Sequence, residues 1–546
     1  MLETEKAFAS LSEEFVEVSL RQDPVAATLA GIHDYDQLFP DHSPDGQRER
    51  GAWLRDFEQR LTAGIPWEEL PTVQRVDFAL LRSKISIARA ELEDLKTFAR
   101  NPVRAAETAL YGIFLLMARP FAPLEERKEA LLARLMALPD YLEGARTSLQ
   151  QVPPLYLSVA IEVASSGPSF VDEVMRQLLQ SFPGEAERIE HAAGRGRVGF
   201  LTYQEALDRD IRARAGGSFA CGQRWMDWRL EHEHLVPFRC ADLEALGREQ
   251  VAATLQELEN EARSLDPSRS WQEQIAAAKS RHPEPLRVRE AYLAEVERAK
   301  RFVEEKRIAP IPKAPLEVAD TPPFERPTTP YAAYLAPAPF DEDPTGWLFV
   351  TPVDTSKPRE IQEQQLQAHP LAGLPITTVH EAYPGHHLQV ASANQVGSRL
   401  RRLADSPMLC EGWALYCEEL MHQQGYYREP ESRLYQLKEL LFRACRIVLD
   451  VGLQTGGMTF EQAVDYLVKT ALVEPSLAES EVKRYALTPT QPLSYLVGKL
   501  LLLELRDETR RRLGSRFVLH DFHAALLASG SVPLTLVREE LSERLK

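Results

Sequence analysis

The sequence predicts a mostly α-helical protein with a few short strands, built as a single large body. Through most of the first 300 residues, apolar side chains recur at three- and four-residue steps, which is the spacing of one helix face. Prolines and glycines separate these segments at intervals that suit a helical array. The same pattern returns from about Leu371 to the C-terminus, and the absence of a repeat period disfavours a solenoid.

Three segments of the N-terminal half show this pattern most clearly. They read LSEEFVEVSLRQDPVAATLAGI (residues 11–32), ERKEALLARLMALPDYLEGARTSLQQV (residues 126–152) and LEALGREQVAATLQELENEARSL (residues 243–265). Each is long enough to bury an apolar stripe against neighbouring helices. We therefore predict that residues 1–309 form an N-terminal helical lobe.

A proline-rich segment follows this lobe. Residues 310–344 contain ten prolines, which excludes a continuous helix. A disordered linker is one alternative, but phenylalanine, tyrosine and leucine occur throughout the segment, which favours an ordered extended chain lying across the helical body. The stretch TGWLFVTPV (residues 345–353) is typical of a short β-strand. Residues 310–350 thus lead into a C-terminal helical lobe, residues 351–546, within one continuous fold.

The charge balance limits the partners of the protein. The formal net charge is −17 and the sequence pI is near 5.4, with 44% hydrophobic and 27% charged residues. Acidic residues are spread along the chain and form a solvated surface rather than a tail. Binding to nucleic acid or to an anionic membrane is therefore not expected, because phosphate contacts require basic patches.

The cysteines and the N-terminal residues predict a reduced, cytoplasmic protein. The chain has five cysteines without a C-x-x-C pair, so neither disulfides nor a thiolate zinc site are expected. The first residues, MLETEKAFAS, lack the basic and apolar regions of a secretory signal. No apolar run reaches the roughly 18–20 residues that a membrane helix needs. The sequence does not indicate the oligomeric state.

The stretch HEAYPGHH, residues 380–387, resembles the H-E-x-x-H zinc signature with extra residues inserted. In that signature two histidines one turn apart bind one ion, and the glutamate takes a proton from water. Here Pro384 occupies the place of the second histidine. Because Pro384 lacks an N–H and Gly385 tolerates unusual backbone angles, a wide turn over residues 383–385 would bring His386 level with His380. His387 is the alternative second ligand.

A catalytic zinc ion needs a third protein ligand. Downstream, the acidic helix CEGWALYCEEL (residues 410–420) offers Glu411, which follows His386 by twenty-five residues, enough for one helix to turn and pack against the other. Glu418 lies on roughly the same face and is a candidate to orient a ligand histidine, although an exposed salt-bridging glutamate is the alternative. Glu381 is the predicted catalytic base. A structural polar cluster is the competing interpretation of the whole group.

Several blocks together resemble a known family. PITTVHEAYPGHHLQ and EGWALYCEE are similar to the bacterial domain-of-unknown-function 885 family, as are DPVAATLAGIHDYD near the start and RIVLDVGLQTGGMTFEQAVDYL and RYALTPTQPLSYLVGKLLLLELR near the end. That family resembles, at a distance, helical zinc peptidases of the gluzincin type such as thimet oligopeptidase and Taq carboxypeptidase. The resemblance implies a two-lobed body with Zn²⁺ at the floor of a deep central cleft.

The sequence departs from the family pattern at two places. Gln454 stands where the pattern has a histidine, and Pro489–Pro492 read P-T-Q-P in place of P-G-Q-A. If the missing histidine takes part in substrate binding, turnover or specificity would differ in this chain. The metal ligands are unaffected.

A tyrosine near the C-terminus is a second catalytic candidate. In helical zinc peptidases a tyrosine hydroxyl donates a hydrogen bond to the developing oxyanion, and the resemblance assigns this role to Tyr495. A core tyrosine is the alternative interpretation. Tyr485 and Arg484 are weaker candidates for the same role.

These observations predict a zinc metallopeptidase that acts on short peptides. A metal-dependent amidase or deacylase acting on a small metabolite fits the same ligands, and a helical binding protein without catalysis is a third possibility. The identity of the substrate, and whether cleavage occurs within a chain or at its end, do not follow from the sequence.

Overall fold

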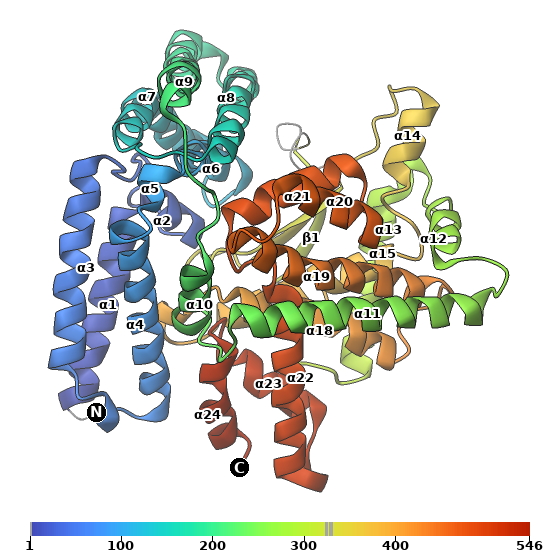
Figure 1. Ribbon diagram of the computed structural model, residues 1–546. Coiled ribbons are helices and arrows are strands. Elements are labelled where there is room, and N and C mark those ends of the chain that lie inside the picture. The colour runs from blue at the N-terminus through green and yellow to red at the C-terminus, as the bar shows by residue number, and fades with distance from the viewer. Residues whose placement is uncertain (1–2, 323–325, 327–330) are drawn as a thin grey trace. The chain divides into compact units, whose positions relative to one another are not determined.

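The computed structural model describes residues 3–322, 326 and 331–546 (Figure 1). Helices make up most of these residues, and one small three-stranded sheet is present, so the predicted mostly helical fold class is confirmed. The chain divides into two compact units. The first contains Met1–Cys221 and Ala338–Asp343, and the second contains Gly222–Pro337 and Pro344–Lys546. The deep central cleft stays a prediction.

The first unit is built from helices that pack side by side. Helix α7 packs on α9, α8 packs on α9 and α6, and α3 packs on α4. The helices are α1 (Glu3–Gln22), α2 (Pro24–Ala30), α3 (Pro44–Gly64), α4 (Thr72–Glu93), α5 (Thr97–Arg100), α6 (Val103–Ala118), α7 (Leu124–Thr147), α8 (Pro154–Ser181) and α9 (Ala186–Ala206). They are joined by the short 3₁₀ helices η1 (Trp67–Glu69), η2 (Pro183–Glu185) and η4 (Arg212–Arg214) and by the short π-helix η3 (Leu207–Ile211).

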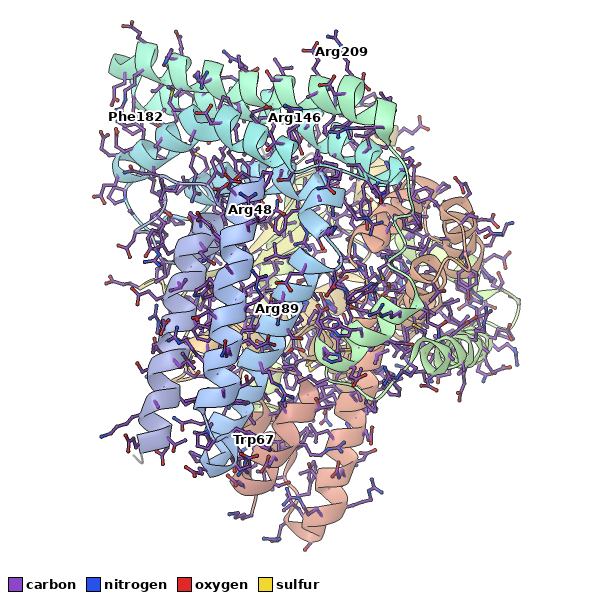
Figure 2. All side chains as sticks on the ribbon, turned by 60° about the vertical axis from the view of Figure 1, so that its left-hand side comes forward. Arg48, Trp67, Arg89, Arg146, Phe182 and Arg209 are labelled. Carbon is purple, nitrogen blue, oxygen red and sulfur yellow. The ribbon has the colours of Figure 1, made fainter. Side chains whose placement is uncertain are left out.

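Ion pairs connect the long helices α3 and α4. Arg89 of α4, labelled in Figure 2, pairs with Glu58 of α3 and donates to Glu93 at 2.9 Å. Trp67, also labelled, lies in the turn η1 that joins the two helices. Such partly exposed pairs contribute little each, so the apolar contact between α3 and α4 carries most of the stability of this pair.

The sequence of the first predicted segment explains the break between α1 and α2. Asp23 caps α2 by accepting a hydrogen bond from Ala26 N at 3.0 Å, and Pro24 occupies the first helical position. Gly31 ends α2 with a φ of 83°, a left-handed conformation that glycine adopts without strain. The predicted helical pattern over residues 11–32 is thus confirmed as two helices.

A histidine in the first unit predicts a pH-dependent stability. His33 lies 2.9 Å from both Asp36 and Asp341, with 27% of its side chain exposed. Burial lowers its pKa, but the hydrogen bonds with Asp341 and Asp36 raise it to about 9. Because the folded pKa lies above the unfolded value, this stabilisation is fully present below about pH 6.5 and is lost as the pH rises through 9.

We therefore expect the free energy of unfolding of wild-type protein to fall by about 1–2 kcal/mol between pH 6.5 and 9.5, after allowance for solvent screening. In the His33→Gln variant this component should disappear. Urea unfolding followed by circular dichroism over this pH range measures it. The exposed His191→Gln variant is the matched control and should keep the wild-type profile. A His33→Gln profile identical to wild type would contradict the prediction.

The second unit contains the remaining helices and the sheet. Its elements are α10 (Gln223–His232), α11 (Cys240–Leu265), α12 (Trp271–Lys279), η5 (Pro285–Arg287), α13 (Val288–Glu305), β1 (Leu316–Asp320), β2 (Ala332–Leu335), β3 (Gly346–Val350), α14 (Arg359–Leu366), α15 (Leu374–Glu381), α16 (His386–Ala393), α17 (Arg399–Arg402), α18 (Pro407–Gln423), α19 (Ser432–Gln454), α20 (Phe460–Ala471), α21 (Pro475–Leu487), α22 (Ser494–Leu513), η6 (Gly514–Arg516), α23 (Leu519–Leu527) and α24 (Leu534–Arg544).

This division differs from the predicted boundary between residues 309 and 310. Helices α10 to α13 belong to the second unit, because α11 packs along α19 and α13 packs on α15 and β1 (Figure 1). Helix α19 begins more than 160 residues after α11 ends, and α15 begins about seventy residues after α13 ends. Their helical pattern alone could not separate them from α1 to α9.

The small sheet orders part of the proline-rich segment. Strand β3 confirms the predicted strand and lies between β1, which is parallel to it, and β2, which is antiparallel. Val318 and Tyr334 both pair with the buried Leu348 of β3. The extended chain predicted for this segment is therefore present in β1 and β2. Its residues 323–325 and 327–330 lie outside the described residues.

Two further findings bear on the predictions from composition. Among residues 3–322, 326 and 331–546, every helix is too short or too polar to cross a membrane. All five cysteines are free thiols, and burial raises the pKa of Cys410 and Cys445 to about 12. These thiols are therefore protonated at neutral pH and poorly reactive.

Candidate metal centre

The HEAYPGHH stretch breaks into two helices instead of continuing as one. Helix α15 ends at Glu381 and α16 begins at His386. Pro384 cannot donate an N–H, and the residue before a proline avoids the helical conformation, so the helix stops here. The Tyr383–Pro384 peptide bond is cis. His380 thus occupies the last turn of α15, and its ring lies 4.8 Å from the ring of His386, at an angle of 88°.

Gly385 lets the two helices approach closely. A Cβ atom at this position would lie 2.0 Å from the carbonyl oxygen of His380 and 2.2 Å from that of Val379. Backbone atoms cannot move aside as the end of a side chain can, so only glycine fits. The turn is also held from α18, because Trp413 Nε1 donates to the Pro384 carbonyl at 2.7 Å. The position of His386 therefore follows from backbone contacts.

Glu411 of α18 meets the two histidines. Its Oε2 lies 3.4 Å from His386 Nε2 and 3.9 Å from His380 Nε2, and one ligand atom of each residue lies within 4.8 Å of the other two. Two ligands of a tetrahedral zinc ion with bonds of 2.0–2.1 Å are about 3.3 Å apart. The Oε2 atom is buried and has no hydrogen-bond partner among the described residues. The donor set and spacing fit a zinc ion after small adjustments.

The electrostatics of this cluster favour a cation. Burial raises the pKa of Glu411, but His386 and His380 lower it to about 2. Burial lowers the pKa of His386, while Glu411, Glu381 and Glu418 raise it to about 9. Without metal, a proton on His386 therefore supplies the positive charge that three carboxylates attract. A metal ion bound there would replace that proton.

Glu418 orients His380, the first candidate ligand. His380 Nδ1–H donates to Glu418 Oε1 at 2.8 Å, and the Glu418 side chain is 1% exposed. This hydrogen bond fixes the tautomer and leaves His380 Nε2 free for a metal, as is typical of ligand histidines. The carboxylate is therefore placed where the sequence analysis expected it, and the exposed salt-bridge alternative does not apply.

The hydrogen bond between His380 and Glu418 predicts how zinc affinity changes when the negative charge of Glu418 is removed. In the Glu418→Gln variant, the dissociation constant for zinc should rise 10- to 100-fold, because His380 loses an ionic acceptor. Competition against a chelating dye measures it.

The neighbouring Glu419→Gln variant is the matched control. Glu419 accepts from Arg433 at 2.7 Å, and no contact joins it to the histidines among the described residues. Its zinc affinity should change less than twofold. Equal losses in the two variants would contradict the orienting role of Glu418.

His387, the alternative ligand, faces the small sheet. Its Nε2–H donates to the Ala314 carbonyl at 3.2 Å, and its Nδ1 accepts from the Tyr334 hydroxyl at 3.1 Å. Burial lowers its pKa to about 4, so the ring is neutral. Both ring nitrogens are occupied, and a metal ligand role for His387 is excluded by this geometry. Gly346 of β3 packs directly on the ring, since a Cβ there would meet Nδ1 at 2.7 Å.

Glu381 and Tyr495 flank the cluster. Glu381 is the last residue of α15, half-buried, and its carboxylate forms no hydrogen bond with any residue that the structure describes. Its charge helps to raise the pKa of His386. The ring of Tyr495 stacks on that of His380 at 6.5 Å and 15°. Burial and the Glu411 carboxylate raise the pKa of Tyr495, which keeps its hydroxyl protonated as a donor.

Two glycines set the distance between Tyr495 and Glu411. Helices α18 and α22 pack together, and a Cβ at Gly412 would lie 2.5 Å from the carbonyl carbon of Gly498. A Cβ at Gly498 would lie 2.0 Å from the carbonyl oxygen of Met408. The two backbones therefore touch at these positions, one residue after Glu411 and three after Tyr495.

The other residues selected from the sequence lie outside the ligand cluster. Tyr485 donates to Glu481 Oε2 at 2.7 Å, and Arg484 donates to the same atom at 2.9 Å. The amide of Gln454 is buried and donates to the backbone carbonyls of Tyr485 and Ala486 at 3.0 and 3.2 Å. Gln454 thus joins α19 to the end of α21. Its predicted effect on turnover stays a prediction.

Sequence reasoning missed Arg446. This residue lies on α19, is 6% exposed and contacts the Tyr495 ring, with its guanidinium carbon 4.5 Å from the ring centre. The available signal was the run LLFRACRIVLDVGLQ (residues 440–454), where two arginines stand among the apolar residues of a largely apolar helix. A buried arginine requires partners, which makes such a position a candidate for function.

The comparisons with known proteins concern family and fold. The model of a family described as "Bacterial protein of unknown function (DUF885)" matches residues 24–541. The solved structure of "a putative lipoprotein of unknown function from Shewanella oneidensis" is 23% identical, covers 97% of this chain and 99% of its own, and has a TM-score of 0.81. A second such structure, from Colwellia psychrerythraea, is 20% identical, covers 100% of both chains and has a TM-score of 0.85. No functionally curated protein matches significantly. These identities indicate a shared fold alone.

Proposed function

The chain belongs to the bacterial family of unknown function DUF885, and we propose that it is a zinc-dependent hydrolase that cleaves peptide or related amide bonds. One observation carries this proposal: His380, His386 and Glu411 bring their ligand atoms to a common point, with Glu418 behind the first ligand. Two histidines and one glutamate are the ligand set of many catalytic zinc sites, which keep a position open for water.

The residues around this point are suited to hydrolysis. Zinc, when bound, supplies a Lewis acid that acidifies water and polarises a carbonyl. Glu381, whose carboxylate has no competing hydrogen bond among the described residues, accepts a proton from the attacking water as its oxygen bonds to the carbonyl carbon. Tyr495 donates a hydrogen bond to the developing oxyanion. Glu381 then gives the proton to the leaving amine as the C–N bond breaks.

Metal analysis of the purified protein tests the first half of the proposal. Protein prepared without chelator should contain close to one zinc ion per chain by elemental mass spectrometry, and dialysis against a chelator should remove it. Replacing both histidines, as His380→Ala and His386→Ala, should abolish zinc retention, whereas His387→Ala should retain it if the variant folds. Metal-free wild-type protein that takes up no zinc would contradict the proposal.

The class of bond is tested separately. A library of unmodified peptides, incubated with zinc-loaded protein and analysed by mass spectrometry, should yield products that disappear in chelator and return with zinc. Zinc-loaded protein that leaves all the peptides intact would exclude the peptidase and leave the amidase or deacylase of a small metabolite. Short flexible peptides are the expected substrates.

The predicted location is a further point for experiment. The two structures with the same fold are described as putative lipoproteins, whereas the composition of this chain favours the cytoplasm. Fractionation of the native host followed by immunoblotting distinguishes a cytoplasmic protein from a membrane-attached one.

A further inference from the structure

A buried arginine next to the metal centre has unused hydrogen-bonding capacity. Arg446 Nε donates to the Tyr485 hydroxyl at 2.9 Å, and its Nη2 donates to Glu481 Oε2 at 3.0 Å. The remaining nitrogen, Nη1, is buried and has no hydrogen-bond partner among the described residues. A buried charged donor without a partner is unfavourable, so the position is suited to an acceptor that arrives with a ligand.

Aromatic rings hold this guanidinium in a fixed place. Its central carbon lies 4.3 Å from the ring centre of Phe442, 4.5 Å from that of Tyr495 and 5.8 Å from that of Tyr485. The rings restrict the rotation of the side chain and exclude water, which strengthens a charged hydrogen bond. An arginine held in this way offers a preorganised donor group for a planar acceptor.

Two arginines share one carboxylate here, so this trio of side chains carries a net positive charge. Arg446 and Arg484 share a single carboxylate, Glu481, whose pKa is raised by burial and lowered to about 2 by the two arginines. Arg484 keeps 34% of its side chain exposed, so this group has a side open to solvent. Arg484 Nη1 also donates to Gln491 Oε1 at 2.6 Å. An incoming anion would therefore balance the charge.

The positive group lies close to the predicted reaction point. The Tyr495 ring contacts the Arg446 guanidinium and also stacks on His380, with centre distances of 4.5 and 6.5 Å. The guanidinium carbon is therefore no farther from the His380 ring than the sum of these two distances. Successive Cα atoms of a peptide are about 3.8 Å apart, so that span accommodates one or two residues.

From this arrangement we propose that Arg446, supported by Arg484, binds the terminal carboxylate of a peptide substrate one or two residues beyond the scissile bond. The protein would then remove residues from the C-terminal end. This inference rests on the proposed hydrolase function and specifies its substrate class. A carboxylate accepts two parallel hydrogen bonds from a guanidinium, which a neutral amide cannot reproduce.

A binding experiment with a protein that cannot turn over tests the inference apart from hydrolysis. The probe is a pair of random pentapeptide libraries, one with free C-terminal carboxylates and one with C-terminal amides. Both are incubated with zinc-loaded Glu381→Gln protein, and retained peptides are identified by mass after ultrafiltration. The free acids should be enriched at least tenfold over the amides.

Variants then assign the preference to the arginine. In the Glu381→Gln background, Arg446→Gln should reduce the enrichment to less than twofold, and Arg446→Lys should recover only part of it because the paired donors are missing. The buried Arg401→Lys variant, whose parent residue pairs with Glu540 in the same unit, is the matched control and should keep the preference. Circular dichroism confirms that each variant is folded.

The possible outcomes separate the two proposals. Equal retention of acids and amides by the parent Glu381→Gln protein overturns the inference, even when wild-type protein cleaves peptides. Amides that end in aspartate or glutamate and are retained as well as the free acids also overturn it, because a side-chain carboxylate is then recognised. A preference for acids that depends on Arg446 supports it, even when wild-type protein cleaves neither library, in which case the hydrolase proposal fails alone.

Discussion

Replacing Gly385 with alanine is expected to abolish zinc retention and to destabilise the second unit by about 3 kcal/mol or more. The added Cβ would lie 2.0 and 2.2 Å from two carbonyl oxygens at the end of α15, so the turn and the helix must separate. That movement pulls His386 away from His380 and Glu411. Zinc content per chain and the midpoint of thermal unfolding are the measurements.

A second glycine provides the matched control for this experiment. Gly397 lies eleven residues after His386 and is exposed. A Cβ added at Gly397 would have no other atom within 4 Å. The Gly397→Ala variant should keep wild-type zinc content and stability. A Gly385→Ala protein that binds zinc as the wild type does would show that the turn does not determine the ligand geometry.

Replacing Glu381 with glutamine is expected to reduce kcat by a factor of about 10²–10⁴ while zinc content stays unchanged. The variant keeps the shape of the side chain but removes the acceptor for the proton of water. This reduction corresponds to about 3–5 kcal/mol of transition-state stabilisation. Peptide cleavage under saturating substrate, with zinc measured in the same sample, gives both quantities.

Comparison with the Glu418→Gln variant distinguishes a loss of turnover from a loss of zinc affinity. Both carboxylates lie near the ligand histidines, but the Glu418→Gln change should act through zinc affinity and the Glu381→Gln change through turnover. Saturating zinc should therefore restore much of the activity of the first variant and none of the second. A zinc-loaded Glu381→Gln enzyme with wild-type kcat would exclude Glu381 as the catalytic base.

Elements with strong local signals could be predicted from the sequence. The periodic apolar residues of α7 and α11, and the aromatic and β-branched residues of β3, determine local structure that tertiary contacts then preserve. The pairing of β1 with β3 joins segments about thirty residues apart and has no such local signal. The assignment of α11 to the second unit depends on its packing against α19, which only the folded chain reveals.

The candidate metal centre could likewise be predicted only where the signal is local in the sequence. Pro384 and Gly385 indicated a break in the helix, because their backbone properties are local. The choice between His386 and His387 was left open in the sequence, since it depends on the Tyr334 hydroxyl and the Ala314 carbonyl, which occupy the ring nitrogens of His387. These partners lie more than fifty residues earlier in the chain.

The backbone contact between Gly412 and Gly498 makes the spacing of Glu411 and Tyr495 independent of how the surrounding apolar side chains are packed. Relatives can therefore exchange leucine, valine or methionine around α18 and α22 and still hold the Glu411 carboxylate and the Tyr495 hydroxyl at the same spacing. A family member with a bulky residue at either position would hold its two helices farther apart. Those two small residues would thus serve to sort family members into groups with the same spacing of the two helices and groups with a wider spacing.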